Sequence, residues 1–238
     1  MNSRLAGLEK TLGYTFRNKA LLQQALTHTS RANEISAHNH CASYERLEFV
    51  GDALLGIAIG SYLYEKLPKS PEGALSKIRA NIVCEKALYR CAVENLGLPE
   101  YVLLGKGEEM CGGRNKPSVL ADVVEAILGA IYMDSCYDVA RAVAVRLLQP
   151  IIQDVLNGRF VDDYKSALQN YIQGEALGDI KYTIISESGP DHDKRFEAEV
   201  RAAGHSAVGS GHTKKEAEQA AAQGLLALIK PIKGEPEK

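Results

Sequence analysis

ERLEFVGDAL, residues 45–54, is the stretch of this sequence that decides its fold. It carries three acids, Glu45, Glu48 and Asp52, separated by three and four residues. On a helix this spacing places the three carboxylates on one face. The residues between them are mostly apolar, so the helix is expected to be largely buried. Like charges at this spacing destabilise a helix by about 0.2–0.5 kcal/mol per pair, and partial burial raises that cost, so a cation is expected to offset it.

A second stretch, LADVVEAIL at residues 120–128, repeats the arrangement in an otherwise apolar run. If the two helices pack together, four carboxylates converge. The predicted metal ligands are Glu48, Asp52, Asp122 and Glu125. Oxygen ligands with no Cys or His nearby suit Mg²⁺, or Mn²⁺ in its place, rather than zinc.

Structural ion pairs are the alternative explanation for these acids, with Arg46, Lys77 or Arg79 as the cations. For one acidic pair alone, the ion-pair explanation is favoured. Two acidic pairs on two apolar helices favour the metal site instead.

The chain is predicted to form two domains. Residues 1–156 show apolar positions that recur every three to four residues, which is typical of an all-α domain. The segments expected to form one helix each are residues 19–30, 44–67, 76–97, 117–135 and 137–156. Turn residues such as Pro68, Gly97 and the pair Gly112-Gly113 lie between these runs.

Residues 157–162 are predicted to be a linker, residues 163–231 a small α+β domain, and residues 232–238 a tail. The α+β domain is expected to have the order α-β-β-β-α, with both helices on one face of an antiparallel sheet. Its expected elements are a helix at 163–177, strands at 181–186, 195–202 and 205–209, and a helix at 213–229.

Composition limits the location of the protein and the kind of surface it carries. The net charge of −2 divides into +1 for residues 1–161 and −3 for residues 162–238, so neither part is basic overall and any surface for a polyanion must be a local face. The five cysteines are odd in number and widely spaced, which indicates reduced thiols. No signal segment and no apolar run of about 18–20 residues is evident. We therefore expect a cytoplasmic protein with no membrane partner.

The last predicted helix begins with two cations, Lys214 and Lys215. Cations at a helix N-terminus oppose the helix dipole, whereas an external anion there is bound both by the lysines and by the free N–H groups. The rest of this helix is Ala-rich, and its composition alone indicates only a stable helix.

Three blocks in this order resemble the ribonuclease III family: LTHTS at 26–30, ERLEFVGDAL at 45–54, and LADVVEA at 120–126 preceded by Ser118. The resemblance covers nearly the whole chain. It implies that the four acids bind metal, that Asp52 and Glu125 are catalytic, and that Glu45 and Glu72 are accessory acids. It also implies a homodimer, formed through the helical domain, that hydrolyses double-stranded RNA to 5′-phosphate and 3′-hydroxyl ends, in the processing of ribosomal and other RNA.

Residues 162–230 resemble the double-stranded RNA-binding domain, through their element order and the segment Gly189-Pro190-Asp191-His192. The resemblance assigns Lys214 and Lys215 to phosphates of the duplex. It assigns the remaining contacts to two minor grooves, with Gly189, Pro190 and His192 in one and Gln169 and Glu175 in the other. Asn170 departs from the acidic residue more usual in that family, so no contact is assigned to it.

Some assignments leave two alternatives open. Lys77, Arg79, Arg114 and Lys116 follow turns near the acidic helices, where they either contact substrate phosphates or are simply solvated. Phe49 is either a dimer-interface residue or part of the core. The alternative function is that of a non-catalytic, dimeric double-stranded RNA-binding protein, which would be expected to have lost one of the four acids.

Overall fold

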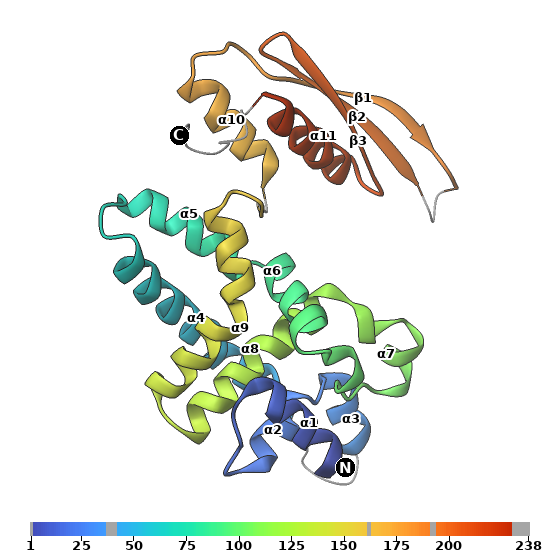
Figure 1. Cartoon of the computed structure of the whole chain (residues 1–238). Helices are drawn as coiled ribbons and strands as arrows, with labels where there is room; N and C mark the ends of the chain where they lie inside the picture. Colours follow the sequence, from blue (N-terminus) through green and yellow to red (C-terminus); the bar gives the residue numbers. More distant parts are fainter. Residues whose placement is uncertain (1, 37–41, 161–162, 191–193, 230–238) are drawn as a thin grey trace. The chain divides into compact units, whose positions relative to one another are not determined.

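The structure is a computed structural model that describes residues 2–36, 42–160, 163–190 and 194–229 (Figure 1). The chain divides into two compact units, Met1–Phe160 and Val161–Lys238. The first is helical, and the second combines helices with a three-stranded sheet.

The helical unit is built around α8, Pro117–Asp134, whose side chains are buried along most of its length. The longest helix, α4, Glu45–Lys66, packs on α8, and the other helices surround this pair. The remaining elements are α1 Asn2–Leu12, α2 Lys19–Ala25, α3 Thr29–Ser36, α5 Glu72–Val83, α6 Glu85–Arg90, a π-helix at Cys91–Asn95, 3-10 helices at Leu98–Glu100 and Gly113–Asn115, α7 Lys106–Met110 and α9 Tyr137–Leu156.

Two glycines bring α4 and α8 together, backbone against backbone. A Cβ atom added at Gly51 would lie 1.9 Å from the carbonyl oxygen of Glu125, and one added at Gly129 would lie 2.1 Å from that of Leu47. Only glycine fits at these two positions, because the atoms in the way belong to the main chain of the other helix. The crossing therefore fixes which residues of α4 face which residues of α8.

By length and composition α4 is also the one described helix that could cross a membrane, with a mean hydropathy of 1.3 in its most apolar window. Its packing explains this composition. Leu54, Leu55, Ile59 and Leu63 are all buried in the core of the helical unit. One face of the helix is therefore apolar because it belongs to the core of the helical unit.

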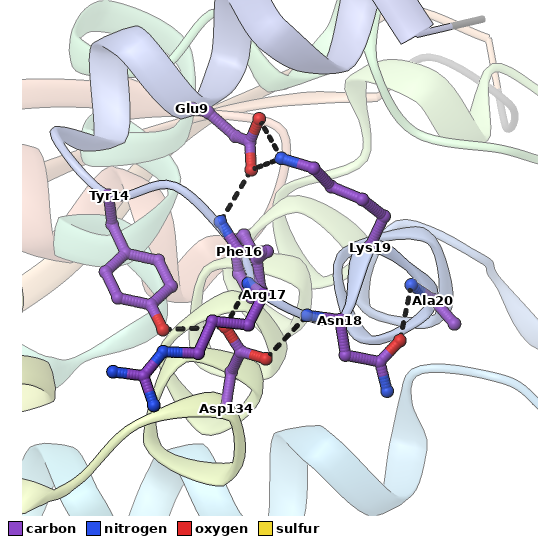
Figure 2. Close-up of polar contacts among 8 residues, drawn as sticks. All are labelled: Glu9, Tyr14, Phe16, Arg17, Asn18, Lys19, Ala20 and Asp134. Atoms are coloured by element: carbon purple, nitrogen blue, oxygen red, sulfur yellow. Dashed lines mark hydrogen bonds and ion pairs between the residues drawn. The ribbon is translucent and has the colours of Figure 1, made fainter.

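Polar contacts fasten the N-terminal segment to the end of α8 and also link residues within the segment (Figure 2). Asp134 accepts hydrogen bonds from the Tyr14 hydroxyl at 2.7 Å and from the backbone N–H groups of Arg17 and Asn18 at 2.8 and 2.9 Å. Glu9, which is 7% exposed, accepts one from Phe16 N–H at 2.7 Å and pairs with Lys19. The bond from Phe16 N–H satisfies the carboxylate of Glu9, which burial would otherwise penalise.

The second unit is a helix, three antiparallel strands in the order β1-β2-β3, and a second helix (Figure 1). Inward-facing residues of β2, such as Phe196 and Val200, pack with Leu168 and Leu225 of the two helices. Gly209 of β3 lets the last helix approach closely, since a Cβ there would lie 2.1 Å from the backbone nitrogen of Ala221. The elements are α10 Tyr164–Gly174, β1 Lys181–Ser188, β2 Arg195–Ala202, β3 His205–Gly211 and α11 Lys214–Ile229.

The predicted fold class, an all-α domain followed by an α-β-β-β-α domain, is confirmed. Two predicted helices are wrong. Residues 19–30 do not form one helix, because Thr27 pairs with Leu103 in a parallel bridge between α2 and α3. Residues 76–97 are interrupted at Cys84, whose extended backbone (ψ 157°) ends α5.

Smaller differences concern the edges of elements. Both outer strands of the sheet run two residues beyond their predicted ends, and β1 contains a bulge between Ile184 and Ser186. The first helix of this unit ends earlier than predicted, at Gly174, and Ala176 beyond it has a left-handed φ of 52°. Phe160, in the predicted linker, is buried in the core of the helical unit.

Candidate active site

The four predicted metal ligands lie at the crossing of α4 and α8. Glu48 and Asp52 flank Gly51 on α4, and Glu125 belongs to the stretch of α8 that Gly51 contacts. Asp122 lies one turn before Glu125 on the same helix. The glycine-mediated crossing therefore brings together two pairs of acids that are far apart in the sequence.

Burial and the charges of neighbouring acids raise the pKa values of three of these carboxyls, Glu48, Asp122 and Glu125. The pKa of Glu125 is raised to about 8, first by burial and then by the charges of Asp52, Asp122 and Glu48. The pKa of Glu48 is raised by burial and by Asp122, Glu45 and Asp52. The pKa of Asp122 is also raised by burial. Acids that act on one another in this way form a single electrostatic cluster, which is a feature typical of functional sites.

Ion pairs do not explain the cluster. Among the residues that the structure describes, none of the four acids pairs with a lysine or arginine, and this includes Arg46, Lys77 and Arg79. The side chain of Arg79 lies instead near Gly60, two turns along α4 from Asp52. The alternative of structural ion pairs is therefore wrong.

The donor set fits a hard divalent cation. The cluster offers carboxylate oxygens and no thiolate, which are the ligands that Mg²⁺ and Mn²⁺ prefer. Within the described parts of the chain, no three Asp, Glu, His or Cys side chains are gathered closely enough to hold one ion as placed. A cation would therefore have to draw these side chains together by rotation, which the exposed position of Asp52 permits.

The predicted accessory acids differ in their relation to the cluster. Glu45 accepts a hydrogen bond from the Ser43 hydroxyl at 2.8 Å, and its charge raises the pKa of Glu48. Glu72 is exposed at the start of α5, where it accepts a bond from the Ser76 hydroxyl at 2.7 Å. The contacts of Glu45 therefore connect it to the four acids, while the one bond described for Glu72 lies within α5.

The four cations offered as phosphate contacts also differ. Lys116 lies near the cluster, and its charge lowers the pKa of Asp122. Arg114 is held by Glu109 and donates to the carbonyl oxygens of Pro99 and Val102, at 2.6 and 3.1 Å. The guanidinium of Arg114 thus braces its own loop. Lys77 and Arg79 are exposed on α5.

Three residues around Asp122 are absent from the predicted site. The hydroxyl of Tyr44 donates to Asp122 at 3.2 Å, and burial raises the pKa of this phenol, so that it remains a donor. The charge of His28 lowers the pKa of Asp122, and that of Glu85 raises it. In the sequence, only the block LTHTS indicated that His28 belongs near the site. Helical spacing gave no indication that Tyr44 or Glu85 lies beside Asp122.

In the second unit, the predicted RNA-binding residues are distributed over three segments. Gln169 and Glu175 are exposed on α10 and at its end, and Gly189 and Pro190 are exposed after β1, with a positive φ of 90° at Gly189. His192 lies outside the described residues.

Lys214 and Lys215 are exposed at the start of α11. Thr213 precedes them and caps the helix, accepting a hydrogen bond from Glu216 N–H at 3.1 Å. The ammonium of Lys214 lies 5.7 Å from the centre of the Phe196 ring. Both lysines therefore begin a well-capped helix and have no carboxylate partner among the described residues.

Comparisons with known proteins agree over both units. The Ribonuclease-III-like family matches residues 18–151, and the Double-stranded RNA binding motif matches residues 164–229. The chain belongs to the ribonuclease III family. Its relatives include proteins named Ribonuclease 3 from Caldanaerobacter subterraneus subsp. tengcongensis, 44% identical over 96% of this chain and 100% of that protein, and from Halalkalibacterium halodurans, 46% identical over 93% of this chain and 84% of that protein.

A solved structure of the same family covers the helical unit. It is the nuclease domain of Ribonuclase III from Campylobacter jejuni, 42% identical with a TM-score of 0.56, covering 60% of this chain and 95% of that one. The resemblance inferred from sequence motifs is confirmed, as is the predicted enzyme class. Ribonuclease III enzymes are in general metal-dependent, which agrees with a cluster of acids that has no cationic side chain of its own.

Proposed function

We propose that this ribonuclease III enzyme hydrolyses phosphodiester bonds of double-stranded RNA with Mg²⁺, or Mn²⁺ in its place, held by Glu48, Asp52, Asp122 and Glu125. The observation that carries the proposal is the convergence of these four unpaired acids at the crossing of α4 and α8. The alternative of a non-catalytic RNA-binding protein is disfavoured, because all four acids are present and the relatives of this chain are named as ribonucleases.

When bound, the metal supplies an activated water and neutralises charge that develops on the phosphate oxygens. The chain supplies the geometry. The carboxylates of α4 and α8 share one rigid crossing, so ligands from both helices hold their positions relative to each other. Asp52 and Glu125 are the proposed catalytic residues, as the resemblance to the family implies; they belong to the two helices of the crossing, and the charge of Asp52 raises the pKa of Glu125. The expected products carry 5′-phosphate and 3′-hydroxyl ends.

The second unit binds the duplex by its shape. Lys214 and Lys215 are proposed to contact phosphates from the N-terminus of α11, where the helix dipole also favours an anion. Gln169 with Glu175, and the segment around Gly189, are proposed to contact two minor grooves. Binding of this kind reads few bases, so many duplexes serve as substrates.

A homodimer is proposed through α4. Phe49, Ile57 and Tyr64 are 79%, 59% and 74% exposed, and their spacing places them on one face of this helix. Exposed apolar side chains gathered on one face mark a protein interface, so the core role considered for Phe49 is wrong. The Campylobacter jejuni nuclease domain has a region described as involved in dimer formation. We place the enzyme in the cytoplasm, in keeping with the free thiols of Cys84, Cys91, Cys111 and Cys136.

The test is cleavage of a long RNA duplex by the purified protein, in Mg²⁺ and in EDTA, followed by sequencing of the product ends. Glu125→Ala is expected to abolish cleavage and to leave duplex binding intact. Glu94→Ala is the matched control, because Glu94 pairs with Arg90 at 2.8 Å and lies outside the cluster. Full cleavage by Glu125→Ala would refute the metal assignment, and cleavage in EDTA would refute the metal-dependent mechanism.

A further inference from the structure

Tyr44 is the residue immediately before the first acid of α4, and it is buried, with 4% of its surface exposed. Its hydroxyl donates to Oδ2 of Asp122 on α8 at 3.2 Å. No other hydrogen bond between described residues is made to the side chain of Glu48, Asp52, Asp122 or Glu125. The bond therefore singles out one oxygen of one ligand and leaves the other oxygen of Asp122 available.

A buried hydroxyl of this kind restricts the rotation of the carboxylate it contacts. Asp122 projects from a helix that is buried on its other faces. The bond from Tyr44 to Oδ2 therefore restricts the rotation of this carboxylate relative to α4 before any cation arrives. An oriented ligand binds a metal more tightly than one that must first lose its freedom, because less conformational entropy is lost.

Tyr44 is itself held by a segment from elsewhere in the sequence. Its backbone N–H donates to the carbonyl oxygen of Thr27 at 2.9 Å. Its ring lies against that of His28, with 5.7 Å between the ring centres. Thr27 is in turn buried and anchored, since its hydroxyl donates to the carbonyl oxygen of Gln23 at 2.7 Å.

The orientation of His28 is also fixed. Its Nδ1 accepts a hydrogen bond from Ser30 N–H at 3.1 Å and lies 2.8 Å from the Ser30 hydroxyl. The same hydroxyl accepts a bond from Gly105 N–H at 2.9 Å. His28 N–H donates to the carbonyl oxygen of Leu103 at 3.0 Å. The support of Tyr44 is therefore a hydrogen-bonded frame that joins residues 27–30 to residues 103–105.

We propose that Tyr44 is a positioning residue that orients Asp122 for metal binding, and that residues 27–30 hold Tyr44 in place for this task. The proposal rests on the metal site proposed above and deepens it. It gives the block LTHTS a physical role as the support of one metal ligand. Tyr44 acts through Asp122 and contacts neither metal nor RNA.

The test is Tyr44→Phe, which keeps the buried ring and removes only the hydroxyl. Loss of an outer hydrogen bond to a metal ligand is expected to weaken Mn²⁺ binding, measured by electron paramagnetic resonance, by about 10-fold or more. The Mg²⁺ concentration for half-maximal cleavage is expected to rise by a similar factor, while kcat at saturating Mg²⁺ changes little. Duplex binding in EDTA is expected to be unchanged.

Tyr14→Phe is the matched control, because it removes another hydroxyl that donates to an aspartate, Asp134, at 2.7 Å and outside the site. It is expected to lower the melting temperature without altering Mn²⁺ affinity. Glu125→Gln separates the two proposals. If Glu125→Gln loses Mn²⁺ and folded Tyr44→Phe binds it as the wild type does, the role of Tyr44 is refuted and the metal site stands. If Glu125→Gln binds Mn²⁺ normally, the metal site itself is refuted.

Ser30→Ala is a second test of the role of Tyr44, to be used if Tyr44→Phe does not fold. It removes the hydroxyl that joins His28 to Gly105 and leaves Tyr44 intact. A loss of Mn²⁺ affinity in the same direction, smaller than that expected for Tyr44→Phe, supports the frame. Wild-type affinity in folded Ser30→Ala would overturn it.

Discussion

Gly51→Ala tests whether the crossing of α4 and α8 sets the geometry of the site. The new Cβ would lie 1.9 Å from the carbonyl oxygen of Glu125 and 2.4 Å from its carbonyl carbon. Ordinary contact begins at 3.4 Å, so the helices must separate by about 1.5 Å at this point. No rotamer relieves the clash, because the opposing atoms are main chain.

The expected loss of stability follows from two opposing effects. Overpacking costs about 1–3 kcal/mol, and the upper end applies here because neither backbone can yield alone. Replacing a helical glycine by alanine recovers about 0.5–1 kcal/mol. The net loss of about 2 kcal/mol corresponds to a melting temperature lower by about 4–8 °C for a unit of this size.

The rate of RNA cleavage is expected to be affected more strongly than the free energy of unfolding. A displacement of about 1 Å can cost about 10²-fold in rate, and Gly51 lies between two proposed ligands, Glu48 and Asp52. We expect kcat at saturating Mg²⁺ to fall by at least that factor at a temperature where the variant remains folded. Duplex binding by the second unit should be unaffected.

The assays are calorimetry for melting and single-turnover cleavage of a duplex for activity. Gly107→Ala in α7 is the control, because a Cβ there meets nothing within 4 Å. It should keep wild-type melting and cleavage. A Gly51→Ala enzyme that also melts and cleaves as the wild type does would refute the role of the crossing.

Three further predictions concern charge and backbone. Because the pKa of Glu125 is raised to about 8, folded metal-free protein binds more protons than unfolded protein, and its free energy of unfolding should fall as pH rises from about 4.5 to 8. Denaturant titrations of Glu125→Gln should show a flatter profile, and an unchanged slope would contradict this cause. Lys214→Ala with Lys215→Ala should lower the salt slope of duplex binding by about two in a log-log plot, whereas an unchanged slope would exclude phosphate contacts. Ala203→Asn should raise the melting temperature of the second unit, because Ala203 has a φ of 53° that asparagine tolerates better than alanine. A lower melting temperature would contradict the inference that the backbone is strained at Ala203.

The acids of the site were predictable because helical periodicity is a local property. Spacing alone placed Glu48 with Asp52 and Asp122 with Glu125, and the structure keeps each pair on one helix. The way the two helices meet was not predictable from spacing. Gly51 was visible in the sequence, but its partner, the backbone of Glu125, belongs to a helix far along the chain.

One of the two missed helix breaks also arises from a contact between distant segments. Apolar periodicity continues through residues 19–30 and 76–97, so local reasoning predicts unbroken helices. The first break is made by the pairing of Thr27 with Leu103, a contact between distant segments. Long-range hydrogen bonds can override local helix propensity, and no spacing rule reveals their partners.

The site gathers negative charge that no ion pair among the described residues neutralises. Repulsion among the four acids opposes the contact between α4 and α8, and a lysine or arginine beside them would remove that cost. The described residues provide no such ion pair, although Lys116 is near enough to act on Asp122. A cationic side chain bound within the cluster would have to be displaced by any metal, with the loss of its own pairing energy. The apolar packing of α8 instead holds the acids together without neutralising them, so the core of this unit stabilises a site whose charge is left for an external cation.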